Sequence, residues 1–180
     1  MAPQKTKDSS HHEAEPGFET KEGQDRRIIK PRGLNVIWGG DPRYWVIPKE
    51  EGKPAELKMA CWLEVTGTVD VKPGKKYQIS FKISFKPDAT GWDQAPVFMS
   101  AKIGKKGKTM WKRIKSINQI IQKSGSESVI PDETDGQFEI NVPPTESDQA
   151  TKLQFGLYEV WTGRWKTGLM IHDASVQEVA

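Results

Sequence analysis

The segment Tyr77-Gln-Ile-Ser-Phe-Lys-Ile-Ser-Phe85 places a large apolar side chain at every second position and a polar one between each pair. Successive side chains of a β-strand point to opposite faces, so this period is typical of a strand with one buried face. Further runs with the same alternation, or a less regular form of it, occupy residues 59–65, 97–103, 137–142, 153–157 and 169–179.

Short turn signals separate these runs, and helical spacing is almost absent. The signals are Lys72-Pro-Gly-Lys75, Lys86-Pro-Asp88, Asp135-Gly136, Pro143-Pro144 and Thr162-Gly163. Proline and glycine at such positions favour tight reversals of the chain. Only residues 113–123 show a short helical pattern of isoleucines. The sequence therefore predicts an all-β fold, an antiparallel β-sandwich of the jelly-roll type with at most one short helix.

The first 28 residues differ from the rest of the chain in composition. They are rich in polar residues, and Phe18 is their only large aromatic side chain. A segment of this kind buries too little apolar surface to offset its loss of entropy on folding. We therefore expect a disordered polar tail at residues 1–28 and a globular domain at residues 29–180.

Cysteine content and hydropathy indicate a cellular compartment. Cys61 is the only cysteine, so no disulfide can form within the chain, and a reducing compartment is the simplest setting. The sequence contains no signal-peptide-like stretch and no run of about 20 apolar residues. We expect a cytoplasmic or nuclear protein without a membrane partner.

The formal net charge is +3, but the charges are unevenly distributed. Residues 102–115 contain seven basic residues and no acidic one, whereas residues 116–150 contain one base and seven acids. Two solvated loop faces are the simplest interpretation. Binding of RNA or another anion through the basic loop 102–115, which includes Trp111, is the alternative.

The segment Trp38-Gly-Gly-Asp-Pro-Arg-Tyr-Trp45 has the composition of a binding loop. Its glycines permit backbone conformations that other residues avoid, and its proline restricts the preceding Asp41. A sugar ring packs its C–H face on an aromatic ring, while its hydroxyls need polar partners, and this loop offers both. A structural loop held by two core tryptophans is the alternative interpretation.

Glu159 is the second unusual residue, because the apolar register of its strand directs its side chain inward. A buried carboxylate without a partner costs several kcal/mol. Three explanations are open: a bend in the strand, a cationic partner, or exposure to a ligand groove. The candidate partners are Arg43, Arg164 and Lys166. We also expect the Thr162-Gly-Arg164 turn to bring Trp161 and Trp165 to one end of a hairpin.

Catalytic chemistry has little support in the sequence. His172 is the only histidine outside the tail, Cys61 has the register of a core residue, and no phosphate loop or metal-ligand cluster is present. Asp41 and Glu159 are the one pair of carboxylates that a glycosidase could use. We predict a protein that is not an enzyme and needs no cofactor or metal.

Three blocks of sequence, in order, resemble the plant phloem lectin family, whose domain is similar to the tobacco agglutinin (Nictaba-like). They are Leu34–Trp45, Ala55–Gly67 and Tyr158–Ile171, and they span nearly all of the globular part. The resemblance implies a non-catalytic lectin for N-acetylglucosamine oligomers, N-glycan cores and glycoproteins. It further implies a homodimer and a location in the cytoplasm, the nucleus, or phloem sieve elements and companion cells.

Within this resemblance, the aromatic platform of the family falls on the two tryptophans of the opening block, and its acidic residue falls on Glu159. A phloem structural or interaction protein without sugar binding is the alternative function. The candidate carbohydrate-binding residues are Trp38, Asp41, Tyr44, Trp45, Glu159, Trp165 and Lys166.

Overall fold

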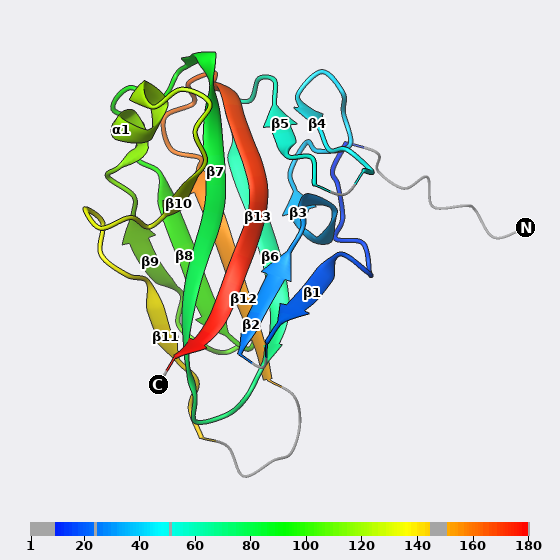
Figure 1. Cartoon of the computed structure of the whole chain (residues 1–180), viewed down its shortest axis with the longest axis vertical. Coiled ribbons are helices and arrows are strands. Elements are labelled where there is room, and N and C mark those ends of the chain that lie inside the picture. The colour runs from blue at the N-terminus through cyan, green and yellow to red at the C-terminus, as the bar shows by residue number, and fades with distance from the viewer. Residues whose placement is uncertain (1–9, 24, 51, 145–150, 180) are drawn as a thin grey trace, which may run out of the picture.

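Two antiparallel β-sheets form the body of the protein in the computed structural model (Figure 1). The structure describes residues 10–23, 25–50, 52–144 and 151–179. Within these residues the only helices are α1 (Ile117–Gln122) and a short 3-10 turn at Pro31–Gly33. The prediction of an all-β antiparallel fold with one short helix is confirmed, and α1 lies inside the segment with helical spacing.

Eight strands form one sheet and five form the other. The larger sheet contains β1 (Glu19–Glu22), β2 (Arg26–Ile29), β13 (Thr167–Val179), β5 (Ala55–Leu57), β4 (Trp45–Val46), β7 (Lys76–Thr90), β10 (Ser128–Ile130) and β11 (Glu139–Asn141). The smaller sheet has the order β3 (Asn35–Val36), β6 (Leu63–Val71), β12 (Thr151–Glu159), β8 (Phe98–Ile103) and β9 (Met110–Arg113).

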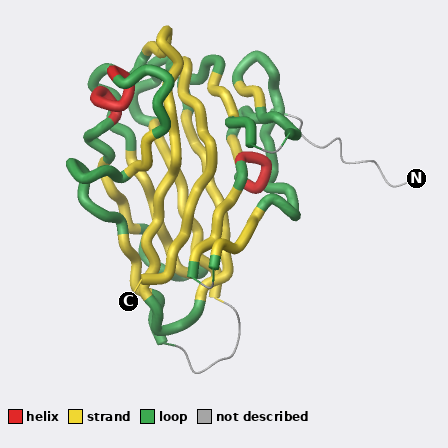
Figure 2. The backbone as a smooth tube through the Cα atoms, in the orientation of Figure 1, coloured by secondary structure: helices red, strands yellow, loops and turns green. Residues whose placement is uncertain are grey.

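The core lies between the two sheets and follows the predicted alternation. The apolar residues of β7 from Tyr77 to Phe85 are all buried, as are Leu153, Phe155 and Leu157 of β12. The rings of Phe81 and Phe155 meet edge to face, with centroids 5.8 Å apart, and so connect the two sheets. Long strands run the length of the sandwich, and loops gather at their ends and flanks (Figure 2).

Two local predictions were wrong. The turn expected at Lys86–Asp88 lies inside β7, which continues to Thr90. Here the ladder with β13 carries a register shift between Thr167 and Leu169, which accommodates the proline without a reversal of the chain. The strand expected from residue 59 begins at Leu63, and Met59 is exposed.

The expected disorder of the N-terminal segment does not hold for its described part. Residues 1–9 lie outside the described residues. β2 pairs with β13, β1 pairs with β2, and His12 forms a backbone bridge to Val36. The edge strand β1 is exposed along its whole length and gains backbone hydrogen bonds without apolar side chains, while β2 buries only Ile28 and Ile29, so composition underestimated this segment. Ordered structure therefore begins well before residue 29.

The loops that matter for function lie near one end of the sandwich. β4, β5, α1 and the connection between β12 and β13 occupy the upper end in Figure 1. Within the described residues, neither helix has the length and apolar character needed to span a bilayer.

We predict that Phe155→Ala lowers the free energy of unfolding by about 3–5 kcal/mol, because it leaves a cavity where the two sheets meet. Urea unfolding followed by circular dichroism measures this change. Val129→Ala, at an exposed position of β10, serves as the control and should change stability by less than about 0.5 kcal/mol. A loss below about 1 kcal/mol for Phe155→Ala would contradict this description of the core.

Candidate functional site

Trp38 has a backbone conformation that residues with a Cβ rarely adopt. Its φ is +65°, in the left-handed region, which costs about 1–2 kcal/mol for such a residue. The backbone N–H of Trp38 donates to Nδ1 of His11 at 2.9 Å, and the two rings meet with centroids 5.2 Å apart. Strain of this kind is typical of functional loops, where surrounding contacts hold it in place.

The glycines of the loop have a different role from the one predicted. Neither Gly39 nor Gly40 has a positive φ, so the unusual conformation lies at Trp38 instead. A Cβ on Gly39 would lie 2.7 Å from Cβ of Val36 and 2.9 Å from Cβ of His12. Gly39 is therefore required because the N-terminal segment packs directly against the loop.

Three aromatic rings meet at the surface beside this loop, and we call Trp38, Tyr44 and Trp165 the loop platform. Tyr44 stacks on Trp165, with centroids 6.4 Å apart and planes 22° apart, and meets Trp38 edge to face at 5.8 Å. Trp38 is 40% exposed and Trp165 is 55% exposed. The sequence predicted these three residues as candidates, and the structure brings them together.

Asp41 and Arg43 give the loop platform a charged edge. The Arg43 side chain donates to both carboxylate oxygens of Asp41, and its guanidinium lies 5.2 Å from the centroid of the Tyr44 ring. The Asp41 carboxylate also accepts from the Arg43 backbone N–H at 2.9 Å, which closes a tight turn. Hydrogen bonding to Arg43 lowers the pKa of Asp41, so this carboxylate is ionised at neutral pH.

Trp45 lies beneath the loop and not on its surface. It is 2% exposed and pairs with Leu57 across the β4–β5 ladder. Its indole N–H has no hydrogen-bond partner among the described residues. In this structure Trp45 anchors the loop, and only Trp38 of the two tryptophans offers a ring to a ligand.

Lys166 is a fully buried cation at the start of β13. Its Nζ lies 3.1 Å from Oε1 of Glu159, and neither side chain is exposed to solvent. The ammonium also donates to the backbone carbonyls of Cys61 at 3.2 Å and Arg164 at 2.9 Å. Of the three explanations open for Glu159, the cationic partner is the correct one, and Lys166 is that partner.

The Glu159 carboxylate has further partners in the loop after β12. It accepts hydrogen bonds from the Trp161 backbone N–H at 2.9 Å and from the Thr162 hydroxyl and backbone N–H. Burial raises the pKa of Glu159, but these hydrogen bonds and Lys166 outweigh it and bring the pKa below its ordinary value of 4.5. Glu159 and Lys166 are therefore internal supports and have no surface to offer a sugar in this structure.

The same supports fix the position of Trp165. Lys166 and Ala60 exchange backbone hydrogen bonds of 2.8 and 3.0 Å. Gly91 has φ +88°, and a Cβ there would lie 2.0 Å from the Trp165 carbonyl oxygen. Any other residue at position 91 would push the Trp165 backbone away, a requirement that no sequence pattern indicated.

Tryptophan exposure reveals a second group of rings, of which the sequence analysis named Trp111 and Trp161 separately but did not predict that they meet. Of the seven tryptophans, only Trp45 and Trp92 are buried. Trp111 and Trp161 are half-exposed and meet each other and Phe98 edge to face on the smaller sheet, and Trp111 also meets Tyr158. Phe98 and Tyr158 alternate with buried residues of their strands, so the sequence predicts that their side chains point outward. This alternation is the signal that could have found the two rings.

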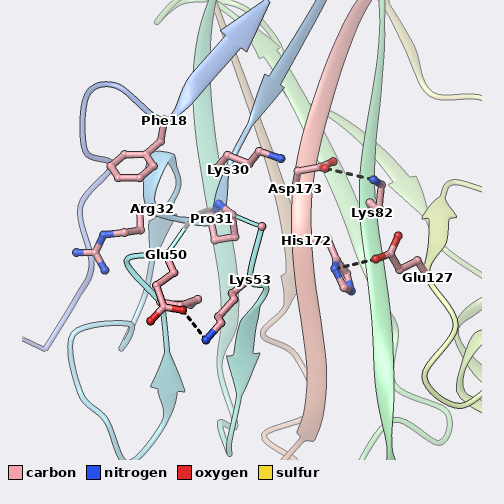
Figure 3. Close-up of a pocket in the computed structure, with 12 residues that line it drawn as sticks. Phe18, Lys30, Pro31, Arg32, Glu50, Lys53, Lys82, Glu127, His172 and Asp173 are labelled. Atoms are coloured by element: carbon pink, nitrogen blue, oxygen red, sulfur yellow. Dashed lines mark ion pairs between the residues drawn. The ribbon is translucent and has the colours of Figure 1, made fainter. Parts of the chain in front are cut away.

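A small hollow on the larger sheet contains His172 (Figure 3). Its volume is about 100 Å³, and ion pairs join its lining residues, including His172 to Glu127 at 3.4 Å and Lys82 to Asp173 at 3.6 Å. Several of its charged side chains are already paired with one another, so the hollow is a weaker candidate than the exposed rings. No group of metal-ligating side chains occurs among the described residues.

We predict that Glu159→Gln lowers the free energy of unfolding by about 3–5 kcal/mol, because it leaves the Lys166 ammonium buried without its counter-charge. Urea unfolding measures the change. Glu64→Gln, at a half-buried glutamate on the same sheet, is the control and should cost less than about 1 kcal/mol. If Glu159→Gln were as mild as the control, the pair would not support the loop.

We also predict that protonation of Glu159 at acid pH lowers the free energy of unfolding of the protein. Because its pKa is lowered in the folded state, its contribution is fully present above pH 4.5 and is lost as the pH falls through the folded pKa. Unfolding at a series of pH values should show a steeper acid-side decline for the wild type than for Glu159→Gln. Parallel declines would show that Glu159 has an ordinary pKa.

Comparison with known proteins places the chain among plant relatives. A family model described as Phloem protein 2 matches residues 24–177. Protein PHLOEM PROTEIN 2-LIKE A9 of Arabidopsis thaliana is 69% identical over 175 residues, which cover 95% of this chain and 97% of that protein. PHLOEM PROTEIN 2-LIKE A1 of the same plant is 29% identical over 83% of this chain and 60% of that protein.

Solved structures give only distant similarity. A Podospora anserina GH26-CBM35 β-(1,4)-mannanase superposes with a TM-score of 0.48 at 8% identity, over 87% of this chain and 28% of that chain. We draw no functional conclusion from a match this remote. The family match and the high identity to the Arabidopsis relative, by contrast, cover nearly the whole chain, and the chain therefore belongs to the phloem protein 2 family.

Proposed function

We propose that the protein is a non-catalytic lectin that binds N-acetylglucosamine oligomers, or the N-glycan cores of glycoproteins, at the loop platform. The observation that supports this most is the convergence of Trp38, Tyr44 and Trp165 on one surface from segments far apart in the sequence. A tryptophan buries a large apolar area when it can. Keeping two of them exposed on a rigid support is expected of a binding surface.

The chemistry of the platform suits an amino sugar. Trp165 would stack on the C–H face of one pyranose ring, and Trp38 on its neighbour. The Arg43 guanidinium, 74% exposed, would donate to an acetamido carbonyl, while Asp41 and the Tyr44 hydroxyl accept from sugar hydroxyls. The site is open and has few polar groups, so we expect a dissociation constant between about 1 μM and 1 mM.

The cellular setting is proposed on the same basis. Membership of the phloem protein 2 family supports a location in the phloem, and the single cysteine fits the reducing cytoplasm or nucleus. A homodimer would present two loop platforms, and two linked sites bind a multivalent glycoprotein more tightly than either alone.

We predict that chitotriose binds the wild type and that Trp165→Ala weakens binding by at least about tenfold, because truncation removes the stacking surface. Trp38→Ala should have a similar effect. Isothermal titration calorimetry measures both. Trp111→Ala, which removes an equally exposed ring on the other surface, is the control and should leave the affinity unchanged.

The unfolding midpoint of each variant must match that of the wild type, so that a loss of binding is not a loss of fold. The proposed function would be wrong if folded wild-type protein gave no binding at millimolar chitotriose and none to N-glycan cores. It would also be wrong if Trp111→Ala abolished binding and the platform variants did not.

A further inference from the structure

The outer face of the smaller sheet carries an ordered array of side chains that the loop platform does not use. Strand register places alternate residues side by side in three rows across the strands. The first row is Arg113, Phe98, Tyr158 and Glu64; the second is Trp111, Ser100, Gly156, Thr66 and Asn35; the third is Lys102, Gln154 and Thr68.

The second and third rows enclose a hollow of about 230 Å³. Short hydroxyl and amide side chains line most of it, and Lys102 supplies a positive charge. Each hydroxyl or amide both donates and accepts hydrogen bonds. This lining matches the vicinal hydroxyls of a sugar. The uncharged polar lining residues are Asn35, Thr66, Thr68, Ser100, Thr109, Gln154 and Tyr158.

Aromatic rings bound one side of this hollow. Tyr158 meets Trp111 at 5.2 Å, Trp111 meets Trp161 at 6.1 Å, and Trp161 meets Phe98 at 5.1 Å, all edge to face. Trp111 and Trp161 are 50% and 51% exposed. The rings hold one another in place, so they form a rigid apolar surface next to the polar lining of the hollow.

Gly156 is necessary for this arrangement. A Cβ at that position would lie 2.5 Å from the Tyr158 ring and 3.1 Å from the Thr66 methyl group. The ring therefore lies across the glycine, and the Tyr158 side chain is hydrogen-bonded to Ser100. Any larger residue at 156 would displace the ring that separates the aromatic surface from the hollow.

Positive charge collects at the end of the face where the third row lies. Lys102 lines the hollow, and the connection from β8 to β9 adds Lys105, Lys106 and Lys108. None of these four has an ion-pair partner among the described residues. The lysines that lie beside acids elsewhere, such as Lys152 with Asp70, are paired. Four cations that have no ion-pair partner among the described residues, next to a hollow suited to a sugar, favour an anionic ligand.

We propose that this face is a second binding site, separate from the loop platform, for an acidic oligosaccharide that carries carboxylates on its sugar rings. One uronic acid ring would stack on Trp111 and Trp161. The next would lie in the hollow, with its hydroxyls on Ser100, Thr66 and Gln154 and its carboxylate on Lys102. Further carboxylates would face the basic loop.

Single-stranded RNA is the competing ligand for a basic surface with exposed rings. The face favours sugar for two reasons. The rings contact one another edge to face and do not form separated platforms for successive bases. The surface between the rings and the lysines is lined by short hydroxyl and amide side chains. Such a lining suits the hydroxyl groups of sugar rings better than it suits stacked bases.

Titration of tetragalacturonic acid into the full-length protein by calorimetry tests the proposal. We expect binding that weakens as NaCl rises from about 0.02 M to about 0.5 M. The fully methyl-esterified tetramer, which has the same rings without the charges, should bind at least about tenfold more weakly. Lys102→Gln should weaken binding by about tenfold, the effect of one lost charged hydrogen bond.

Gly156→Ala and Trp111→Ala should each weaken binding of the acidic tetramer, while Trp38→Ala and Trp165→Ala leave it unchanged. Thermal unfolding checks that Gly156→Ala remains folded, and Lys102→Gln tests the site if it does not. Three results would overturn the proposal: absence of binding, equal binding of the ester, or sensitivity to the platform variants only.

A uridine oligomer that binds through Lys102 when the acidic sugar does not would also overturn the proposal and would assign the face to nucleic acid. Chitotriose titrated in parallel separates this proposal from the proposed function. Chitotriose binding without tetragalacturonate binding overturns only the second site. Tetragalacturonate binding without binding of either chitotriose or an N-glycan core overturns only the loop platform.

Discussion

The buried ion pair between Glu159 and Lys166 is the interaction on which both candidate surfaces depend. It joins the end of β12 to the start of β13, and the ammonium also holds the Cys61 carbonyl in front of β6. Buried charges are costly, and a pair is tolerated only when further hydrogen bonds satisfy both groups. Here backbone groups and Thr162 complete the hydrogen bonding of both charged groups, which holds the connection at both of its ends.

That geometry determines where the aromatic side chains are exposed. The loop between β12 and β13 carries both Trp161, two residues after Glu159, and Trp165, directly before Lys166. Trp161 joins the rings of the smaller sheet, and Trp165 stacks on Tyr44. The connection held by this ion pair thus contributes one ring to each of the two surfaces, one proposed for neutral amino sugars and one for acidic sugars.

Sequence alternation predicted the sandwich because strand burial depends on side-chain periodicity, and β7 and β12 are long enough to show it clearly. It did not predict β1 and β2, because β2 is held by backbone pairing with β13, near the other end of the sequence, and β1 is held by pairing with β2. The composition of the loop predicted Trp38 and Tyr44 of the loop platform, but it could not show that Trp45 is buried. Trp45 is buried where β4 pairs with β5, and the partner residue Leu57 lies outside the predicted loop segment.

The remaining differences have a similar origin. The left-handed conformation at Trp38 is stabilised by His11, and the position of Trp165 requires Gly91, so each depends on a residue distant in sequence. The rings of the smaller sheet come from β8, β9 and the end of β12, which become neighbours only through the sheet order. Local patterns describe one strand at a time and cannot report which strands lie side by side.

The indole N–H signals of the seven tryptophans, recorded by NMR during a chitotriose titration, test the central claim that the loop platform binds an amino sugar. Signals of Trp38 and Trp165 should move in a saturable way, while those of the buried Trp45 and Trp92 remain essentially in place. A titration in which no indole signal moves, or in which only Trp111 and Trp161 respond, would contradict the claim.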